Sequence, residues 1–258
     1  LLYSMIDTED KYNEIVNDIV RLSLYADILY PFALKSTLEK FYEEKPEGEM
    51  NDNLLQVRKI LWEKLNKFKM KIFEFDNAKF IHIGNTIEVL DMENKNYENY
   101  KFLGWGKNTG CSLVFDKFSG YNSVIDESCK IGNNCYIENS YICKNAKIGN
   151  NCIISFMKIE DEVIPNDVVI HGIKLLNGNY VVRIYGINDN PKQNYLFGID
   201  IKEPLWSAKI YKEEKDLKMA LKSSLEIYNE IHEQKSIKGI LNNNLSLSDG
   251  FNKAEPFS

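Results

Sequence analysis

The sequence predicts a mixed α and β chain built around a parallel β-helix. Three observations support this fold class. Apolar residues follow helical spacing in the first quarter of the chain, one hexapeptide occurs twice near the middle, and a long amphipathic stretch covers residues 213–232. We therefore expect an N-terminal helical region, a β-helix and a C-terminal helix, in that order.

The N-terminal region is expected to consist of helices followed by short strands. Ile15, Ile19 and Leu22 lie at the i, i+4 and i+7 spacing of one helix face. Pro31 ends this run, because its ring cannot join the helical hydrogen-bond ladder. Later changes in the apolar period predict helices over 36–42, 51–65 and 86–92 and short strands over 70–75 and 80–83.

A repeat of 17 residues is the strongest signal in the sequence. Lys-Ile-Gly-Asn-Asn-Cys occurs at 130–135 and again at 147–152. Steps of six, six and five residues separate seven isoleucines: Ile125, Ile131, Ile137, Ile142, Ile148, Ile154 and Ile159. This hexapeptide rhythm indicates a left-handed parallel β-helix over 110–175. We expect three or four coils, in which each Ile points inward and stacks on the Ile of the next coil.

Glycines and cysteines recur within the same repeat. Gly132 and Gly149 are expected at corners, where left-handed backbone angles are common. Cys135 and Cys152 occupy equivalent positions one coil apart and, with Val168, are expected to fill the interior. The five cysteines include no CxxC pair, which argues against a disulfide framework or a zinc ribbon.

The rest of the chain is expected to extend the β-helix with strands and a long helix. The apolar pattern predicts strands over 180–185, 196–201 and 206–211 and a helix over 213–232. The resulting domain assignment is a first domain over 1–95, the β-helix over 110–175, a β-extension with a helix over 176–235, and a linker over 236–258.

Composition excludes several classes of function. The 32 basic and 38 acidic residues give a net charge of −6, which argues against a nucleic-acid binder. No stretch approaches about 18 apolar residues, so we expect no membrane span. The first ten residues lack a basic segment, so we expect no signal peptide and a reduced, cytoplasmic chain.

A polar cluster at 180–192 is the best candidate for a binding site. Strand alternation places Arg183 and Tyr185 on one face, and Asn188, Asn190 and Lys192 follow in a loop. These side chains could hold a phosphate or sugar hydroxyls. The same residues also fit a salt bridge from Arg183 and an Asx-turn loop. Arg183 is one of only three arginines, so we expect it to use its planar fork.

Two histidines are further candidates. His82 ends a predicted strand and fits either a structural hydrogen bond or a substrate contact. His171 follows the last predicted β-helix strand, where left-handed β-helix acyltransferases often use a histidine as a base.

Several stretches resemble the fucose-1-phosphate guanylyltransferase (GDP-fucose pyrophosphorylase) family. This family includes the pyrophosphorylase half of bifunctional fucokinase/GDP-fucose pyrophosphorylase enzymes. The most specific match is VVRIYGINDNPK at 181–192. The others are SLYADILYPFALKSTL at 23–38, FIHIGNT at 80–86, SVID at 123–126, IHG at 170–172 and LSLSDGFN at 245–252.

The resemblance implies a sugar nucleotide-forming enzyme. In such an enzyme a sugar 1-phosphate attacks the α-phosphate of GTP, Mg²⁺ neutralises charge and pyrophosphate leaves. Catalysis then consists mainly of positioning and electrostatic stabilisation. The resemblance also implies a Rossmann-like nucleotide-binding domain before the β-helix, so that residues 1–95 would be the end of that domain.

One departure from the family pattern limits what we expect of this chain. The family's Gly-rich nucleotide loop does not occur, since the first glycine is Gly48. We therefore expect this chain alone not to perform guanylyl transfer. Two alternatives stay open: a non-catalytic β-helix scaffold that assembles a homo-oligomer, and a hexapeptide-repeat acyltransferase.

Overall fold

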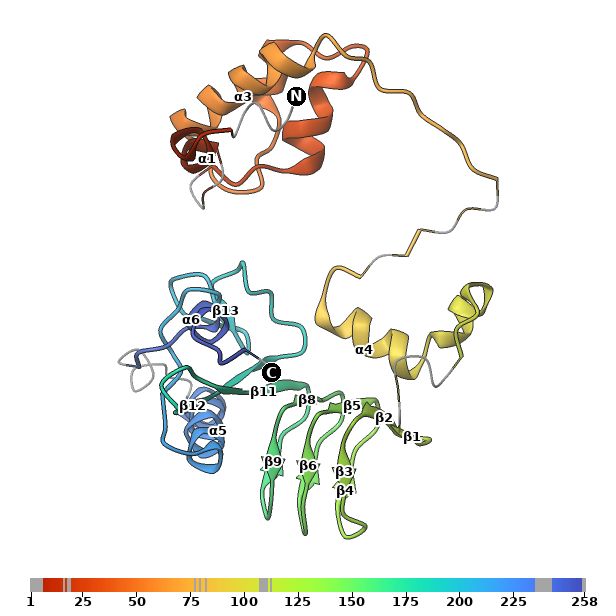
Figure 1. Cartoon of the computed structure of the whole chain (residues 1–258), viewed down its shortest axis with the longest axis vertical. Helices are drawn as coiled ribbons and strands as arrows, with labels where there is room; N and C mark the ends of the chain where they lie inside the picture. The colour runs from red at the N-terminus through yellow and green to blue at the C-terminus, as the bar shows by residue number, and fades with distance from the viewer. Residues whose placement is uncertain are drawn as a thin grey trace. The chain divides into compact units, whose positions relative to one another are not determined.

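The computed structural model describes residues 7–15, 17, 20–76, 78, 80–81, 83–106, 111, 113–234 and 243–256 (Figure 1). The chain divides into two compact units, Leu1–Lys79 and Phe80–Ser258. Each unit is described by itself.

Helices make up the first unit, as predicted, but Ile15 and Leu22 do not share one helix, because α1 ends at Ile15 and Leu22 lies outside the helices. Its elements are α1 (Glu9–Ile15), a π-helical turn η2 (Leu24–Leu29), a 3-10 turn η3 (Tyr30–Phe32), α2 (Leu38–Glu43) and α3 (Asp52–Leu65). Asn51 caps α3, because its side-chain oxygen accepts a hydrogen bond from the Leu54 N–H at 2.9 Å. Pro31 lies at the start of η3, where its missing N–H breaks no intrahelical bond.

A buried ion pair lies in the core of this unit. Nε of Arg58 donates to Asp27 at 2.7 Å, and both side chains are fully buried. A terminal nitrogen of Arg58 also donates to the carbonyls of Phe41 and Glu44, at 2.9 and 2.8 Å. One planar guanidinium thus joins three segments, which a lysine could not do. The apolar side chains around it are Ile15, Val20, Phe41, Leu54, Val57, Leu61 and Leu65.

The prediction of strands over 70–75 and 80–83 is wrong for the described residues of these segments. Their backbone is irregular, and their large apolar side chains are exposed, with Ile72 at 87% and Phe80 at 84%. Alternating residues form a strand only where a second strand pairs with them, and the described part of the first unit contains none. The Rossmann-like sheet that the resemblance implies is therefore not among these residues.

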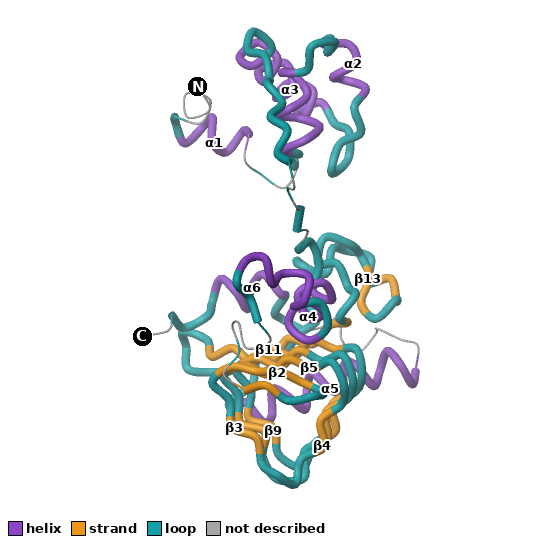
Figure 2. Tube along the Cα trace, turned by 90° about the vertical axis from the view of Figure 1, so that its right-hand side faces the viewer, coloured by secondary structure: helices purple, strands orange, loops and turns teal. Residues whose placement is uncertain are grey.

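A β-solenoid of about three turns forms the body of the second unit (Figure 2). Its turns place strands in three sheets, in the orders β1-β2-β5-β8-β11-β12, β3-β6-β9 and β4-β7-β10. The strands are β1 (Leu113–Val114), β2 (Phe118–Tyr121), β3 (Val124–Ile125), β4 (Lys130–Ile131), β5 (Cys135–Glu138), β6 (Tyr141–Ile142), β7 (Lys147–Ile148), β8 (Ile153–Ser155), β9 (Lys158–Ile159), β10 (Val163–Ile164), β11 (Val168–Lys174) and β12 (Tyr180–Gly186).

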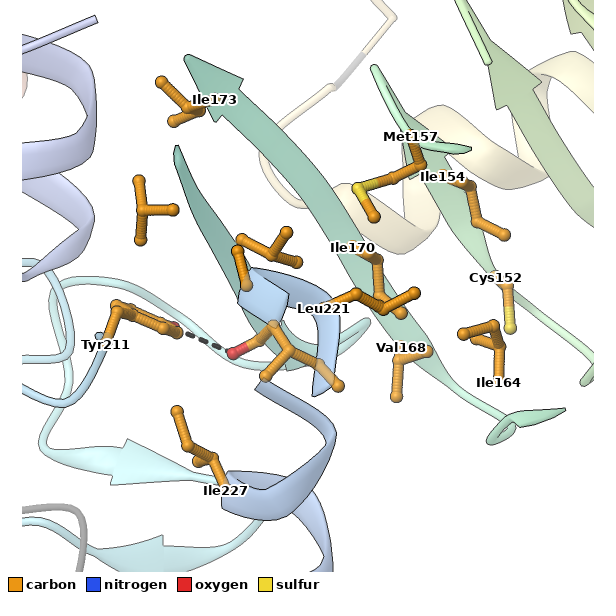
Figure 3. Close-up of a cluster of buried hydrophobic side chains, with 14 of the residues drawn as sticks. Cys152, Ile154, Met157, Ile164, Val168, Ile170, Ile173, Tyr211, Leu221 and Ile227 are labelled. Atoms are coloured by element: carbon orange, nitrogen blue, oxygen red, sulfur yellow. Dashed lines mark hydrogen bonds between the residues drawn. The ribbon is translucent and has the colours of Figure 1, made fainter. Parts of the chain in front are cut away.

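The register of these strands confirms the predicted stacking of isoleucines. Parallel pairing aligns Ile125 with Ile142 and Ile159, Ile131 with Ile148 and Ile164, and Ile137 with Ile154 and Ile170. The cysteine prediction is also confirmed, because Cys135, Cys152 and Val168 are fully buried in the same core. Figure 3 shows this core continuing beyond the solenoid, where the Tyr211 hydroxyl donates to the Ile184 carbonyl at 2.8 Å.

The corner glycines have a different role from the one expected. The left-handed backbone angles occur at neighbouring residues, with φ of 57° at Asn134 and 54° at Asn151. Gly132 and Gly149 are needed because the turns stack closely. A Cβ on Gly132 would lie 2.5 Å from the Gly149 carbonyl oxygen, and one on Gly149 would lie 2.6 Å from the backbone nitrogen of Asn166.

Helices cover two faces around the end of the solenoid. α4 (Thr86–Asn94) packs Leu90 on the outer face of the six-stranded sheet and belongs to the second unit. α5 (Leu217–Gln234) packs on β12, where the Ser224 hydroxyl donates to the Val182 carbonyl. The other elements of this unit are η4 (Tyr97–Leu103), β13 (Tyr195–Leu196), β14 (Ile199–Asp200) and α6 (Leu247–Asn252).

Three expectations for the C-terminal region are corrected. The segment expected to be one strand over 196–201 forms a short hairpin, in which β13 and β14 pair antiparallel. The strand expected over 206–211 is reduced to one isolated bridge between Tyr211 and Leu245. The segment expected to be a linker is ordered over 243–256, where α6 forms and Ala254 bridges to Leu175. This segment lies against the solenoid because Leu245 and Leu247 bury their side chains in the main core.

Among the described residues, no helix has the length and apolar character needed to cross a membrane.

Candidate functional site

Two of the predicted site residues meet on the outer face of the six-stranded sheet. β11 and β12 pair antiparallel, and their register places His171 directly opposite Arg183. A terminal nitrogen of Arg183 hydrogen-bonds Nδ1 of His171 at 2.5 Å. Both residues are site candidates from the sequence, but for different chemistries, and the strand register joins them in one site.

A line of polar side chains leads across the sheet to this pair. Parallel pairing aligns Tyr121, Glu138, Ser155 and His171 on successive strands, and Arg183 follows on β12. We call these five residues the polar row. The Ser155 hydroxyl donates to the Glu138 carboxylate at 2.7 Å. Sequence reasoning missed Glu138 and Ser155, although their spacing of 17 residues matches the repeat and could have revealed them.

A cavity of about 590 Å³ opens beside the Arg183 end of the polar row. Phe156, Leu217 and Phe251 give it apolar walls, whereas His171 and Arg183 contribute polar groups. The Phe156 ring centroid lies 5.7 Å from that of His171. The lining also includes Lys174, Tyr180, Ala254, Glu255 and Pro256. A concave, mostly apolar site with a few polar groups is typical of small-molecule pockets.

The positive charge of Arg183 has no carboxylate partner among the described residues. One terminal nitrogen donates to the Leu247 carbonyl at 3.0 Å, the other bonds His171, and the buried Nε has no partner. Burial lowers the pKa of Arg183 from its usual value, which marks a guanidinium held away from water. Lys174 differs, because it is paired with Glu255 at 2.6 Å. The cavity therefore carries one uncompensated cation.

His171 is a neutral hydrogen-bond donor in this cavity. Burial, and then the charge of Arg183, lower its pKa to about 4, so the ring is uncharged near neutral pH. Arginine can only donate, so Nδ1 of His171 accepts and the ring proton lies on Nε2. That N–H has no protein partner among the described residues and remains available to a ligand.

The other predicted site residues do not converge on the cavity. Tyr185 lies on the same face of β12 as Arg183 but packs beneath α4, and burial raises its pKa. Asn188, Asn190 and Lys192 are exposed, and the Asn190 side chain accepts the Lys192 backbone N–H at 3.0 Å, as in an Asx turn. His82 lies outside the described residues.

The described residues offer no dedicated site for the Mg²⁺ that the resemblance implies. No group of three or more His, Cys, Asp or Glu side chains in this part of the chain converges where it could hold a metal ion. We therefore assign no metal ligand and derive no step through the ion.

Comparison with known proteins identifies the family. The model of the fucose pyrophosphorylase domain matches residues 1–230, which is most of the chain. No curated protein and no solved structure matches the chain. The match includes β11, β12, His171 and Arg183, whereas the cavity wall at 251–256 lies beyond it. The chain therefore belongs to the fucose pyrophosphorylase domain family, a family of nucleotidyltransferases.

Proposed function

We propose that the chain is part of an enzyme that makes GDP-fucose from GTP and fucose 1-phosphate. An oxygen of the sugar phosphate attacks the α-phosphorus of GTP, a new P–O bond forms, and pyrophosphate leaves with the electrons of the broken P–O bond. The single observation that carries this proposal is the family match over residues 1–230.

The chemistry of the cavity supports a role in binding rather than in proton transfer. Arg183 and the Nε2–H of His171 are donors, which suit the oxygens of a phosphate or a sugar. A histidine that acts as a general base needs a free lone pair, but Nδ1 already accepts from Arg183. This hydrogen-bond pattern favours substrate binding over the acyltransferase alternative.

The residues that bind GTP and Mg²⁺ are proposed to lie in other parts of the full enzyme. The family's Gly-rich loop does not occur in this sequence, and the helical first unit is proposed to be the end of the nucleotide-binding domain. The second unit then contributes the Arg183–His171 cavity. We accordingly expect this chain alone not to turn over substrate.

Pyrophosphate release from GTP, Mg²⁺ and fucose 1-phosphate tests the proposal. The assay compares this chain with the same chain extended upstream to the start of its reading frame. Release of pyrophosphate by the extended form, only when fucose 1-phosphate is present, is the expected result. No release by either form would contradict the proposal and leave the β-helix scaffold as the better account.

A further inference from the structure

The guanidinium of Arg183 is a cation in the cavity that lacks a counter-charge among the described residues. A guanidinium has five N–H donors, and Arg183 uses two of them, one to Leu247 and one to His171. Holding an unpaired charge away from water is costly unless an opposite charge compensates it. No carboxylate among the described residues does so, and the neighbouring Lys174 is already neutralised by Glu255.

The geometry points to a phosphate monoester of a sugar as the missing partner. We propose that its phosphate lies against Arg183 and the Nε2–H of His171, and that an apolar face of its sugar ring lies against Phe156 and Phe251. The inference rests on the proposed function for the identity of the sugar, because fucose is the sugar of the family. The oxyanion chemistry rests on the cavity alone.

The apolar walls suit an apolar face of a sugar ring. Phe156, Leu217 and Phe251 offer no side-chain hydrogen-bond partner for a sugar hydroxyl. Phe251 lines the cavity but makes none of the hydrogen bonds of Arg183 or His171. We therefore assign Phe251 as a residue that contacts the sugar ring and not the phosphate.

Calorimetric binding to this chain tests the inference without catalysis. Fucose 1-phosphate is expected to bind most tightly, inorganic phosphate more weakly, and fucose without its phosphate weakest. Arg183→Lys keeps the positive charge but loses the planar fork. It is expected to lower the affinity for fucose 1-phosphate about 10- to 100-fold, the range for the loss of one charge-assisted hydrogen bond. Lys147→Ala removes an exposed charge from β7 and serves as the matched control, with unchanged affinity.

Two further pairs separate the roles of the lining residues. His171→Gln keeps an acceptor for Arg183 and a side-chain N–H for the ligand, so it is expected to bind within about threefold of the parent. His171→Phe loses both groups and is expected to weaken binding about tenfold or more. Phe251→Ala is expected to lower the affinity for fucose 1-phosphate while leaving the affinity for inorganic phosphate unchanged.

The outcomes distinguish this inference from the proposed function. Equal affinity of the Arg183→Lys variant and the parent, or no binding of either phosphate by the parent, would overturn the phosphate site even if the extended chain releases pyrophosphate. Arg183-dependent binding of both phosphates by a chain whose extended form makes no GDP-fucose would support the phosphate site and refute the proposed function. An equal loss of affinity for both phosphates in Phe251→Ala would overturn the assignment of Phe251 as a residue that contacts the sugar.

Discussion

Replacing His171 by Gln is expected to remove part of the acid sensitivity of the second unit. The pKa of His171 falls from 6.5 to about 4 in the folded chain, because burial and then Arg183 disfavour the imidazolium. As the pH falls below 6.5, the unfolded chain therefore takes up a proton here before the folded chain does. The free energy of unfolding consequently decreases as the pH falls and levels off below about pH 4.

The size of this effect follows from the two pKa values. At about 1.4 kcal/mol per pH unit, acidification from about pH 7.5 to about pH 5 removes up to about 2 kcal/mol through His171. Gln cannot be protonated, yet its side-chain oxygen can still accept a hydrogen bond from Arg183. The variant should therefore lose up to about 2 kcal/mol less than the parent over the same pH range.

Urea denaturation at both pH values measures this difference. The quantity compared is the acid-induced loss of the free energy of unfolding in the parent and in His171→Gln, so that carboxylates titrating in both proteins cancel. Equal losses in the two proteins would refute the assignment of His171 as a buried neutral ring. An NMR titration of His171 gives an independent check, and a midpoint near 6.5 would contradict the same reasoning.

Three further substitutions test the structural account by urea denaturation. Asp27→Asn leaves Arg58 charged and buried and is expected to cost the first unit about 3–5 kcal/mol, whereas a cost below about 1 kcal/mol would show that the pair is solvated. Gly149→Ala places a Cβ 2.6 Å from the backbone nitrogen of Asn166 and is expected to cost about 1–3 kcal/mol; a neutral effect would contradict the close stacking of the turns. Ile154→Ala empties a fully buried position and is expected to cost about 2–5 kcal/mol, and no loss would contradict its place in the core.

The solenoid could be predicted in detail because its repeat encodes its own register. Each coil adds 16 or 17 residues, so equivalent positions are the ones that pair, as Ile137, Ile154 and Ile170 do. The reason for the corner glycines could not be predicted in the same way. Gly132 and Gly149 are required by contacts between turns, and such contacts exist only once the turns are stacked.

Local patterns misled where tertiary contacts decide the outcome. The alternation over 70–75 resembles a strand, but no described strand of the first unit pairs with it. The candidate site shows the same limit. Arg183 and His171 were both chosen from the sequence, yet their contact depends on the β11–β12 register, which residue type alone does not fix. Asn188 and Lys192 follow Arg183 closely in sequence but lie in a loop that does not line the cavity.

The most direct test of the account is the effect of Arg183→Lys on the steady-state kinetics of the extended, active enzyme. Because Arg183 is proposed to hold the sugar phosphate and not the nucleotide, KM for fucose 1-phosphate is expected to rise about tenfold or more while KM for GTP stays unchanged. The Lys147→Ala control should alter neither constant. An unchanged KM for fucose 1-phosphate, or an equal rise in both KM values, would contradict the placement of the sugar phosphate beside Arg183 and His171.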